Sequence, residues 1–349
     1  MGTESIKSTT RQILARAYYT TRHYLTRLRG KVLILNYHRI LPQEILNQSP
    51  PVQAGMYVRD DVFEEHIRFL AKHFSLLSIA ELLVRWKENT LNSENRYCAI
   101  TFDDGWLDNY LYAFPILKRY DVPATIFLPT ALIGTEQWFW PDKLTFLLDQ
   151  CLAKADSNRK ADASQFLQSR FPWMSPLGDG TDSALIDGII EKCKTQPLEE
   201  IKNLLDNAGE TLGIKFPVDR VLMDWGEVDE MSRKNISFGS HSCTHRILTT
   251  LAPKEVQAEV EESFHTLRSR CENVVPVLAY PNGDYDSEIA DRVRAAGYQA
   301  ALSTRFGYEG HSPKDLFALS RVGVHQDISA TTPLFALHIA GGNQILGSS

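Results

Sequence analysis

The sequence lacks any excess of positive charge: its 349 residues include 37 Lys and Arg against 43 Asp and Glu, which gives a formal net charge of −6. Proteins that bind nucleic acids use clustered basic residues to displace the counterions of the phosphates. We therefore expect no DNA or RNA partner. No apolar run reaches the roughly 20 residues that a membrane-spanning helix requires, so the sequence predicts no transmembrane helix.

Paired cysteines and a secretion signal are missing as well. The five cysteines are an odd number, and none of them forms a C-x-x-C pair, the spacing typical of thiolate metal sites and redox dithiols. The N-terminus has neither the apolar core nor the small-residue cleavage site of a signal peptide. These absences favour a cytoplasmic protein with free thiols.

The first 30 residues are basic and amphipathic. One acid, Glu4, stands among six basic residues, and apolar residues recur at helical spacing: Lys7, Arg11, Arg16, Arg22, Arg27 and Arg29, with Leu14, Tyr18, Leu25 and Leu28. A helix of this kind can lie on an anionic membrane surface, which would make the protein peripheral to the inner membrane. The alternative is that residues 1–30 pack on the protein's own domain.

Residues 31–340 are expected to form one large domain, in which short apolar runs alternate with longer helical patterns. This alternation indicates a parallel sheet or barrel covered by helices. The expected strands are Val32–Tyr37, Cys98–Phe102, Ala124–Leu128, Ile236–Gly239, Val277–Tyr280, Tyr298–Ser303 and Ala318–Val322. The expected helices are Asp61–His73, Ile79–Trp86, Leu107–Tyr120, Lys254–Arg270 and Ser287–Ala296. From about residue 134 to 221 helical patterns continue without a convincing strand, so we expect a helical insertion there.

Two adjacent carboxylates follow the expected strand Cys98–Phe102. Asp103 and Asp104 are succeeded by Gly105, which permits a sharp turn of the backbone. In α/β proteins catalytic groups gather at the carboxyl ends of parallel strands. Taken alone, the motif is equally compatible with an ordinary Asp-Gly turn whose acids face solvent.

Two histidines follow the expected strand Ile236–Gly239. His241 and His245 are four residues apart, so a helical turn would put both on one face, where they could share a metal ion. Imidazole together with carboxylate suits Zn²⁺ and other borderline divalent ions. Local hydrogen bonding of both rings is the alternative. The aspartates at the end of another strand favour the metal site.

Two further strand ends carry candidate groups. His38 ends the strand Val32–Tyr37, and a pKa of about 6.5 suits the protonation of a leaving amine. Tyr280 and Pro281 precede Asn-Gly in a turn that could aim a backbone N–H at a developing oxyanion. A hydrogen-bonded structural histidine and a tight connecting turn are the simpler interpretations of these two segments.

Together these four segments resemble the polysaccharide deacetylases of the NodB-homology type, carbohydrate esterase family 4. The resemblance covers most of the chain apart from the insertion, and it implies a distorted (β/α) barrel as the catalytic domain at residues 31–340. In the family, the TFDDG motif supplies the catalytic base and a metal ligand, which correspond here to Asp103 and Asp104. The HSxxH motif supplies two further ligands, which correspond here to His241 and His245.

The sequence departs from the common family pattern in two places. The family's acid histidine usually lies near the C-terminus, whereas here a Tyr-His-Arg segment comes first, as in the circularly permuted branch that resembles exopolysaccharide de-N-acetylases. His38 is then the expected acid, with His325 as its rival. The family's usual arginine before the Pro-aromatic turn is missing, and Arg321 is the expected replacement, by pairing with Asp103.

The resemblance implies metal-dependent hydrolysis of the N-acetyl group of an amino sugar in a polysaccharide or glycan precursor, with release of acetate. The ion, zinc first and cobalt or nickel as alternatives, would polarise the amide carbonyl. Asp103 would accept a proton from water, the backbone N–H of Tyr280 would help to hold the oxyanion, and His38, as an imidazolium, would protonate the nitrogen. Two alternatives stay open: a deacylase or deformylase of a polyprenyl-linked sugar at the membrane face, and an inactive sugar-binding relic of the fold.

Overall fold

The computed structural model describes residues 3–48, 52–152, 165, 168–169 and 183–342. Its contacts divide the chain into two compact units. The first unit combines Met1–Pro42, Gly55–Thr135 and Leu222–Ser349, and the second combines Gln43–Ala54 with Glu136–Val221. Each unit has a hydrophobic core of its own.

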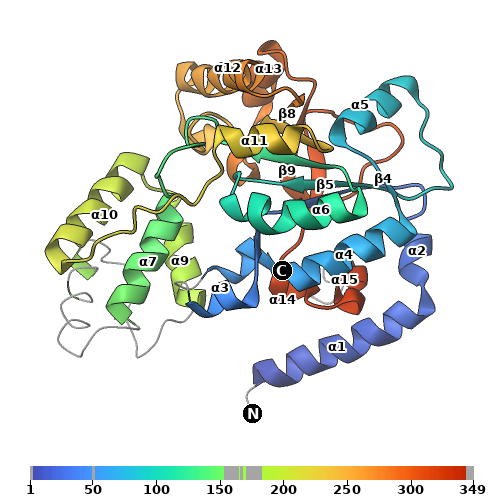
Figure 1. Cartoon of the computed structure of the whole chain (residues 1–349), viewed down its shortest axis with the longest axis horizontal. Helices are drawn as coiled ribbons and strands as arrows, with labels where there is room; N and C mark the ends of the chain where they lie inside the picture. Colours follow the sequence, from blue (N-terminus) through green and yellow to red (C-terminus); the bar gives the residue numbers. More distant parts are fainter. Residues whose placement is uncertain (1–2, 49–51, 153–164, 166–167, 170–182, 343–349) are drawn as a thin grey trace. The chain divides into compact units, whose positions relative to one another are not determined.

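A closed parallel barrel of seven strands forms the centre of the first unit (Figure 1). Its strands are β1 (Val32–Tyr37), β5 (Tyr97–Phe102), β6 (Ala124–Leu128), β7 (Ile236–Ser240), β8 (Val274–Ala279), β9 (Ala300–Phe306) and β10 (Leu319–Gly323). Around the barrel they follow the order β1-β10-β9-β8-β7-β6-β5, and the pairing of β5 with β1 closes the ring. The sequence predicted all seven strands, with small differences at their ends.

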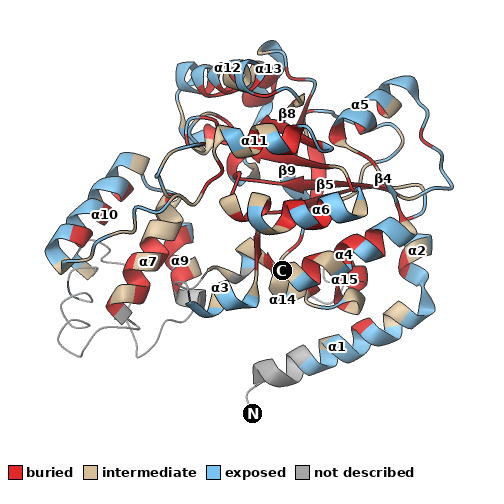
Figure 2. Ribbon diagram, in the orientation of Figure 1, coloured by how far each residue is buried: buried red, intermediate tan, exposed pale blue. Residues whose placement is uncertain are grey.

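The strands of the barrel are buried on both faces, which explains their continuous apolar runs. Figure 2 shows the central strands in red, the colour of buried residues. Successive side chains of a strand point to opposite faces. In β5, Tyr97 and Ala99 belong to the core cluster of the barrel. The same alternation brings Thr101 and then Asp103 to the inner face at the carboxyl end of the strand.

Helices surround the barrel within the first unit (Figure 1). They include α4 (Asp60–His73), α5 (Ile79–Glu88), α6 (Phe114–Tyr120), α11 (Trp225–Ser232), α12 (Pro253–Arg270) and α13 (Ser287–Ala295). Each has buried residues on one side and exposed residues on the other (Figure 2). The Asp286 side chain caps the start of α13, because its carboxylate accepts a hydrogen bond from the Ile289 N–H at 2.8 Å.

The structure differs from the prediction between Leu107 and Tyr120, where a single helix was expected. A π-helix, η2 (Asn109–Ala113), precedes α6 there. Pro115 in the first turn of α6 has no N–H to donate, so the ladder of hydrogen bonds cannot run unbroken through this segment. Three short strands were also missed. β2 (Arg39–Leu41) pairs with β3 (Tyr57–Arg59), and β4 (Ser75–Leu76) pairs with the start of β5.

The first and last helices of the first unit pack together. α1 (Thr3–Thr21) contacts α15 (Thr332–Ile339) through Ala15, which lies against Leu334 and Leu337. Arg11 of α1 also donates to two backbone carbonyls of α14 (Gln326–Ser329), at 3.4 and 3.5 Å. A short helix, α2 (His23–Arg27), connects α1 to the barrel. Within the described residues, none of the helices has the length and apolar character needed to cross a membrane.

The second unit is built from helices. They are α3 (Gln43–Gln48), α7 (Trp140–Leu152), α9 (Ser183–Cys193) and α10 (Leu198–Leu212). Leucine and isoleucine side chains from the last three form its core, for example Leu147, Ile189 and Leu205. The described part of the stretch from about residue 134 to 221, for which an insertion was predicted, contains helices and no barrel strand. None of the five cysteines, all of which lie in the described part of the chain, forms a disulfide bond.

Candidate metal and catalytic centre

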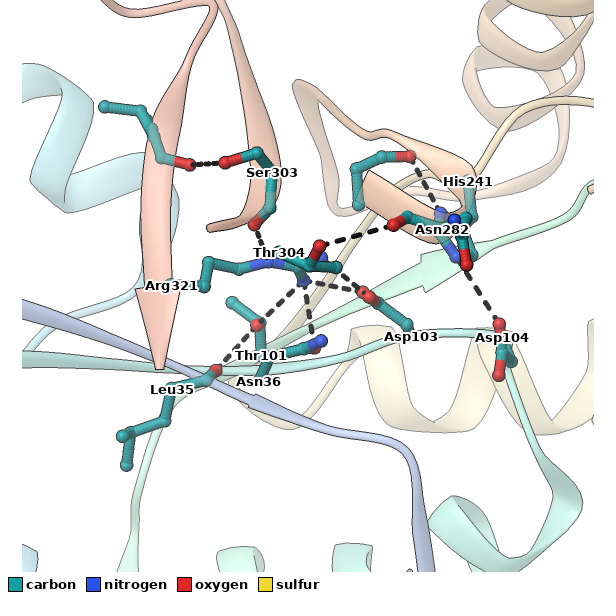
Figure 3. A network of polar contacts seen from close by, with 12 residues as sticks. Leu35, Asn36, Thr101, Asp103, Asp104, His241, Asn282, Ser303, Thr304 and Arg321 are labelled. Atoms are coloured by element: carbon teal, nitrogen blue, oxygen red, sulfur yellow. Dashed lines mark hydrogen bonds and ion pairs between the residues drawn. The ribbon is translucent and has the colours of Figure 1, made fainter. Parts of the chain in front are cut away.

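A buried ion pair lies inside the carboxyl end of the barrel (Figure 3). Arg321 of β10 donates from Nη1 to Asp103 Oδ1 at 2.8 Å and from Nη2 to Asp103 Oδ2 at 2.7 Å. Both side chains are almost completely buried. Burial acts to raise the pKa of Asp103, but the charge and hydrogen bonds of Arg321 outweigh it and lower that pKa. The Asp103 carboxyl is therefore ionised at neutral pH.

Hydrogen bonds to neighbouring strands fix the orientation of the Arg321 guanidinium. Its Nε donates to the backbone carbonyl of Ser303 in β9 at 2.9 Å, and its Nη1 donates to Asn36 Oδ1 in β1, also at 2.9 Å (Figure 3). A bidentate pair of this kind fixes direction as well as charge. The contact between Arg321 and Asp103 that the sequence suggested is present.

Three potential metal ligands converge beside this pair. Asp104 Oδ1 lies 3.4 Å from His241 Nε2 and 3.1 Å from His245 Nε2. The three ligand atoms lie within 4.8 Å of one another. Burial acts to raise the pKa of Asp104, yet the hydrogen bonds and charges of the two histidines hold it well below its usual value.

A tight turn after β5 separates the two aspartates. Asp104 and Gly105 both have positive φ, 73° and 67°. A Cβ on Gly105 would also lie 2.7 Å from a methyl group of Leu128, so both the positive φ and the close packing favour glycine there. The turn directs Asp103 at Arg321 and Asp104 at the histidines. The second oxygen of Asp104, Oδ2, accepts a hydrogen bond from Trp106 Nε1 at 2.9 Å.

The loop of His241 and His245 is not the helical turn that the sequence suggested, so that prediction is wrong. Ser242 and His245 both have a φ of 62°, in the left-handed region. This backbone path, rather than an i, i+4 helix face, brings the two rings together. His241 Nδ1 lies 2.7 Å from the Ala279 carbonyl, which can only accept, so Nδ1 carries the proton and Nε2 faces Asp104.

The donor set of Asp104, His241 and His245 fits a divalent cation. It offers two imidazole nitrogens and one carboxylate oxygen, the combination that zinc and other borderline ions accept. The hydrogen bond from His241 to a backbone carbonyl is the kind of outer contact that orients a metal-binding histidine. These donors suit cobalt and nickel as well as zinc.

His38 follows β1 and lies close enough to the site for both aspartates to affect its ionisation. Burial lowers the pKa of His38, and the opposing charges of Asp104 and Asp103 do not restore it. The neutral imidazole therefore predominates at pH 7. A proton must reach His38 during turnover if it is to serve as an acid.

His325, the rival acid, lies in different surroundings. Its Nδ1 pairs with Asp327, and its backbone carbonyl accepts a hydrogen bond from the Ser329 hydroxyl. Among the residues that the structure describes, His325 makes no hydrogen bond or ion pair with Asp103 or Asp104. His38, by contrast, is placed so that the charges of both aspartates act on its pKa.

Tyr280 and Pro281 directly follow β8, which ends at Ala279. The Tyr280 N–H donates to the Leu302 carbonyl at 3.0 Å, and its hydroxyl donates to the Phe317 carbonyl at 3.0 Å. Pro281 opens the short helix η4 (Pro281–Gly283) and has no N–H. The expectation that the Tyr280 N–H holds an oxyanion is therefore corrected, because β9 already takes that hydrogen bond.

Sequence reasoning missed three residues directly after the DDG motif. Trp106 supports Asp104, and the guanidinium of Arg39 stacks over its ring at 4.2 Å. Asp108 accepts from Arg39 Nε at 2.8 Å, and Asn109 Nδ2 donates to the His38 carbonyl at 2.8 Å. These contacts hold the segment that carries His38. Trp106, Asp108 and Asn109 lie within four residues of Gly105 in the sequence, and this proximity to the motif could have indicated them.

Comparisons with known proteins agree with this geometry. Residues 90–161 and 192–301, just over half of the chain, match the model of a family described as polysaccharide deacetylase. The Bacillus subtilis protein YxkH, which its name assigns to the polysaccharide deacetylases, is 22% identical over 303 residues, covering 86% of this chain and 74% of that protein. The poly-beta-1,6-N-acetyl-D-glucosamine N-deacetylase of Staphylococcus epidermidis is 33% identical over 115 residues, covering 31% of this chain and 39% of that enzyme.

Solved structures share the fold. The Streptococcus pyogenes deacetylase PplD in complex with acetate matches with a TM-score of 0.54 at 19% identity, over 86% of this chain and 94% of that one. IcaB from Ammonifex degensii matches with a TM-score of 0.53 at 15% identity, over 88% of this chain and 97% of that one. The predicted fold, a distorted (β/α) barrel of the polysaccharide deacetylase type, is confirmed.

Proposed function

Because this chain belongs to the polysaccharide deacetylase family, and is thus a hydrolase of carbon–nitrogen bonds, we propose that it removes the N-acetyl group of an amino sugar in a polysaccharide or glycan precursor and releases acetate. One observation carries the proposal: Asp104, His241 and His245 converge beside an Asp103 that Arg321 keeps ionised. The partial match to a poly-beta-1,6-N-acetyl-D-glucosamine N-deacetylase supports oligomers of that sugar as the first substrate to test.

Asp104, His241 and His245 are the proposed ligands of a divalent ion. Zinc is the first choice, with cobalt or nickel as alternatives. When bound, such an ion supplies a Lewis acid that polarises the acetamido carbonyl and lowers the pKa of water. The contacts of Trp106 with Asp104 and of the Ala279 carbonyl with His241 keep two of these donors aimed at the shared position.

Asp103 is the proposed general base. Its low pKa keeps it unprotonated at neutral pH, so it can accept a proton from the attacking water. Arg321 holds both carboxylate oxygens, and each oxygen keeps a second lone pair for the proton. Arg321 is therefore proposed to fix the direction of the base.

The nitrogen needs one proton when the bond between the carbonyl carbon and the nitrogen breaks, because it leaves as a free amine. Asp103 has by then gained one proton from water, so the count balances without an outside acid. His38 is the proposed carrier of this last proton. Its pKa responds to the charges of Asp103 and Asp104, which supports a place beside the reacting groups.

The test is acetate release from N-acetylglucosamine oligomers. Chelator-treated protein is compared with protein reconstituted with Zn²⁺, Co²⁺ or Ni²⁺, and with the Asp103→Asn variant. We expect release that depends on the ion and is lost in the variant. Release that is equal in chelated and reconstituted protein would contradict the proposed metal dependence, and failure to bind any ion would contradict the metal site.

A second candidate is a deacylase or deformylase that acts on a polyprenyl-linked sugar at a membrane face. The observation in its favour is on α1, where Ile13 is 63% exposed and Leu14 is 46% exposed beside the exposed Arg16. Apolar side chains flanked by basic ones bind anionic lipid surfaces.

Liposome co-sedimentation separates this candidate from the first. Deleting α1 would uncover α15, so the paired substitutions Ile13→Ser and Leu14→Ser are the better variant, because both side chains are exposed. The second candidate predicts weaker binding of this variant to anionic vesicles. Equal partitioning of wild type and variant would remove its support.

A further inference from the structure

Glu259 is a buried carboxylate that no step of the proposed reaction uses. It lies in α12 and is only 6% exposed. Its Oε2 accepts hydrogen bonds from the backbone N–H groups of Cys243 at 2.9 Å and Thr244 at 2.8 Å, and its Oε1 accepts one from the Thr244 hydroxyl. All three donors belong to the loop between His241 and His245. Glu259 therefore binds the loop that carries two of the three proposed ligands.

This loop needs support from outside because its backbone conformation is unfavourable by itself. Ser242 and His245 both have a φ of 62°, which non-glycine residues rarely adopt. Within the loop, the Ser242 hydroxyl accepts a hydrogen bond from the His245 N–H at 3.0 Å. Between these two positions, the backbone N–H groups of Cys243 and Thr244 donate hydrogen bonds to Glu259.

The same helix holds the start of the loop. Ser263 lies four residues after Glu259, so both side chains are on one face of α12. Its Oγ lies 2.7 Å from Ser240 Oγ, which in turn accepts a hydrogen bond from the Ser242 N–H at 3.1 Å. Val260, between them in the sequence, is fully buried and anchors α12 in the core. One anchored helix face therefore holds the loop at two points.

We propose that Glu259 is a positioning residue of the metal centre. It fixes the loop of residues 240–245 in the one conformation that directs Nε2 of both His241 and His245 at Asp104. It is not a ligand, because its two oxygens bind the loop. The inference rests on the proposed function, since it presupposes that a divalent ion binds these three side chains. Partners outside the ligand set commonly act in this way, by orienting the ligands.

The test is the dissociation constant for Zn²⁺, measured by competition with a chromophoric chelator on folded, metal-free protein. Glu259→Ala removes all three hydrogen bonds, and we expect it to weaken Zn²⁺ binding by about 10- to 100-fold. Glu259→Gln should stay within about threefold of wild type. Its amide oxygen can accept both N–H bonds while its NH₂ group donates to the Thr244 hydroxyl.

Glu262→Ala is the matched control. Glu262 is an exposed acid one turn further along α12, and the Cys243 thiol lies 3.9 Å from its carboxylate. The control removes the same charge near the loop without removing a backbone hydrogen bond, so it should leave Zn²⁺ affinity unchanged. If it weakens binding as much as Glu259→Ala does, or if Glu259→Gln does so, charge rather than positioning is responsible and the proposal is overturned.

Thr244→Val keeps the proposal testable if Glu259→Ala does not fold. Thr244 is exposed, so its replacement by valine leaves no cavity in the core, and it removes one of the three hydrogen bonds. We expect about threefold weaker Zn²⁺ binding, and unchanged affinity would overturn the proposal. Wild-type protein that binds no Zn²⁺ would contradict the proposed function itself. Wild type and Glu259→Ala that bind equally tightly would contradict only the role of Glu259.

Discussion

Two groups of buried histidines in the first unit occupy opposite environments. At the carboxyl end of the barrel, His241 faces Asp104. Between α4 and α15, His66 lies with Nε2 2.9 Å from a backbone carbonyl and with its ring stacked on Phe335 at 3.9 Å. Burial disfavours the charged form of both rings. Neighbouring aspartates reverse the effect for His241, whose pKa is raised, whereas the pKa of His66 falls to about 3.

The difference shows that burial alone does not make a histidine functional. His338 belongs with His66: its Nε2 lies 2.7 Å from the Gly323 carbonyl, and burial lowers its pKa to about 4. A carbonyl accepts a hydrogen bond but brings no net charge. A carboxylate brings a charge that a cation can share, so a histidine beside Asp104 is suited to hold a metal ion, whereas His66 and His338 are not.

Removing the Asp104 carboxylate should leave His241 and His245 without their charged neighbour. We expect Asp104→Ala to weaken Zn²⁺ binding by more than about 100-fold and to abolish acetate release, because both rings lose their anionic neighbour. Metal content after dialysis and acetate release are the measurements. Asp291→Ala, at an exposed acid of α13, is the control. One equivalent of Zn²⁺ bound at wild-type affinity in Asp104→Ala would contradict the ligand assignment.

Changing the neighbouring aspartate should separate catalysis from metal binding. Asp103→Asn keeps the shape of the side chain but cannot accept the proton from water. We expect turnover to fall by about 10²- to 10⁴-fold while one equivalent of Zn²⁺ stays bound. The measurement is the turnover number with saturating Zn²⁺, alongside metal content. A near-native rate would show that Asp103 is not the base.

Removing Arg321 tests the positive charge that balances these aspartates. Arg321→Met leaves Asp103 buried without its partner, which should lower the free energy of unfolding by about 3–5 kcal/mol. Urea denaturation measures the loss. The control is Arg233→Met, which breaks an exposed pair with Asp229 and should cost no more than about 1 kcal/mol. If both variants lose the same free energy of unfolding, burial of the pair between Arg321 and Asp103 does not increase its contribution to stability.

Acid should affect the second group of histidines. The pKa of His66 is about 3 in the folded protein and about 6.5 in the unfolded chain, so the unfolded chain takes up a proton first as the pH falls. Stability should therefore decrease below about pH 6.5, by about 2 kcal/mol from this group between pH 7 and pH 5. Urea denaturation at both pH values measures it. His66→Gln should reduce the difference, and an unchanged difference would contradict the assignment.

The barrel could be predicted because burial leaves a clear trace in the sequence. β1, β5, β6 and β7 are buried at every position, so each is mainly apolar, and β1, β5 and β7 each have a polar group directly after them. Parallel strands then bring those polar groups to one end. The strands β2, β3 and β4 have two or three residues each, too few to show any periodicity.

The details of the site could not be predicted because they depend on partners far away in the sequence. The left-handed backbone of Ser242 and His245 is not favoured by either residue type, and contacts with other segments stabilise it. The Tyr280 N–H is engaged by Leu302, a residue of another strand. The pKa of His38 follows from the depth at which the fold buries it. In each case the partner lies outside the sequence motif whose residue it affects.

The closure of the barrel brings motifs from the two ends of the chain next to each other. β1, the first strand of the ring along the chain, pairs with β10, the last. Across this seam Arg321 of β10 reaches Asn36 of β1 as well as Asp103. Because the ring closes, its first and last strands along the chain are neighbours, so groups far apart in the sequence meet at one site. A function lost from one end of the chain can therefore be supplied from the other end without moving the site.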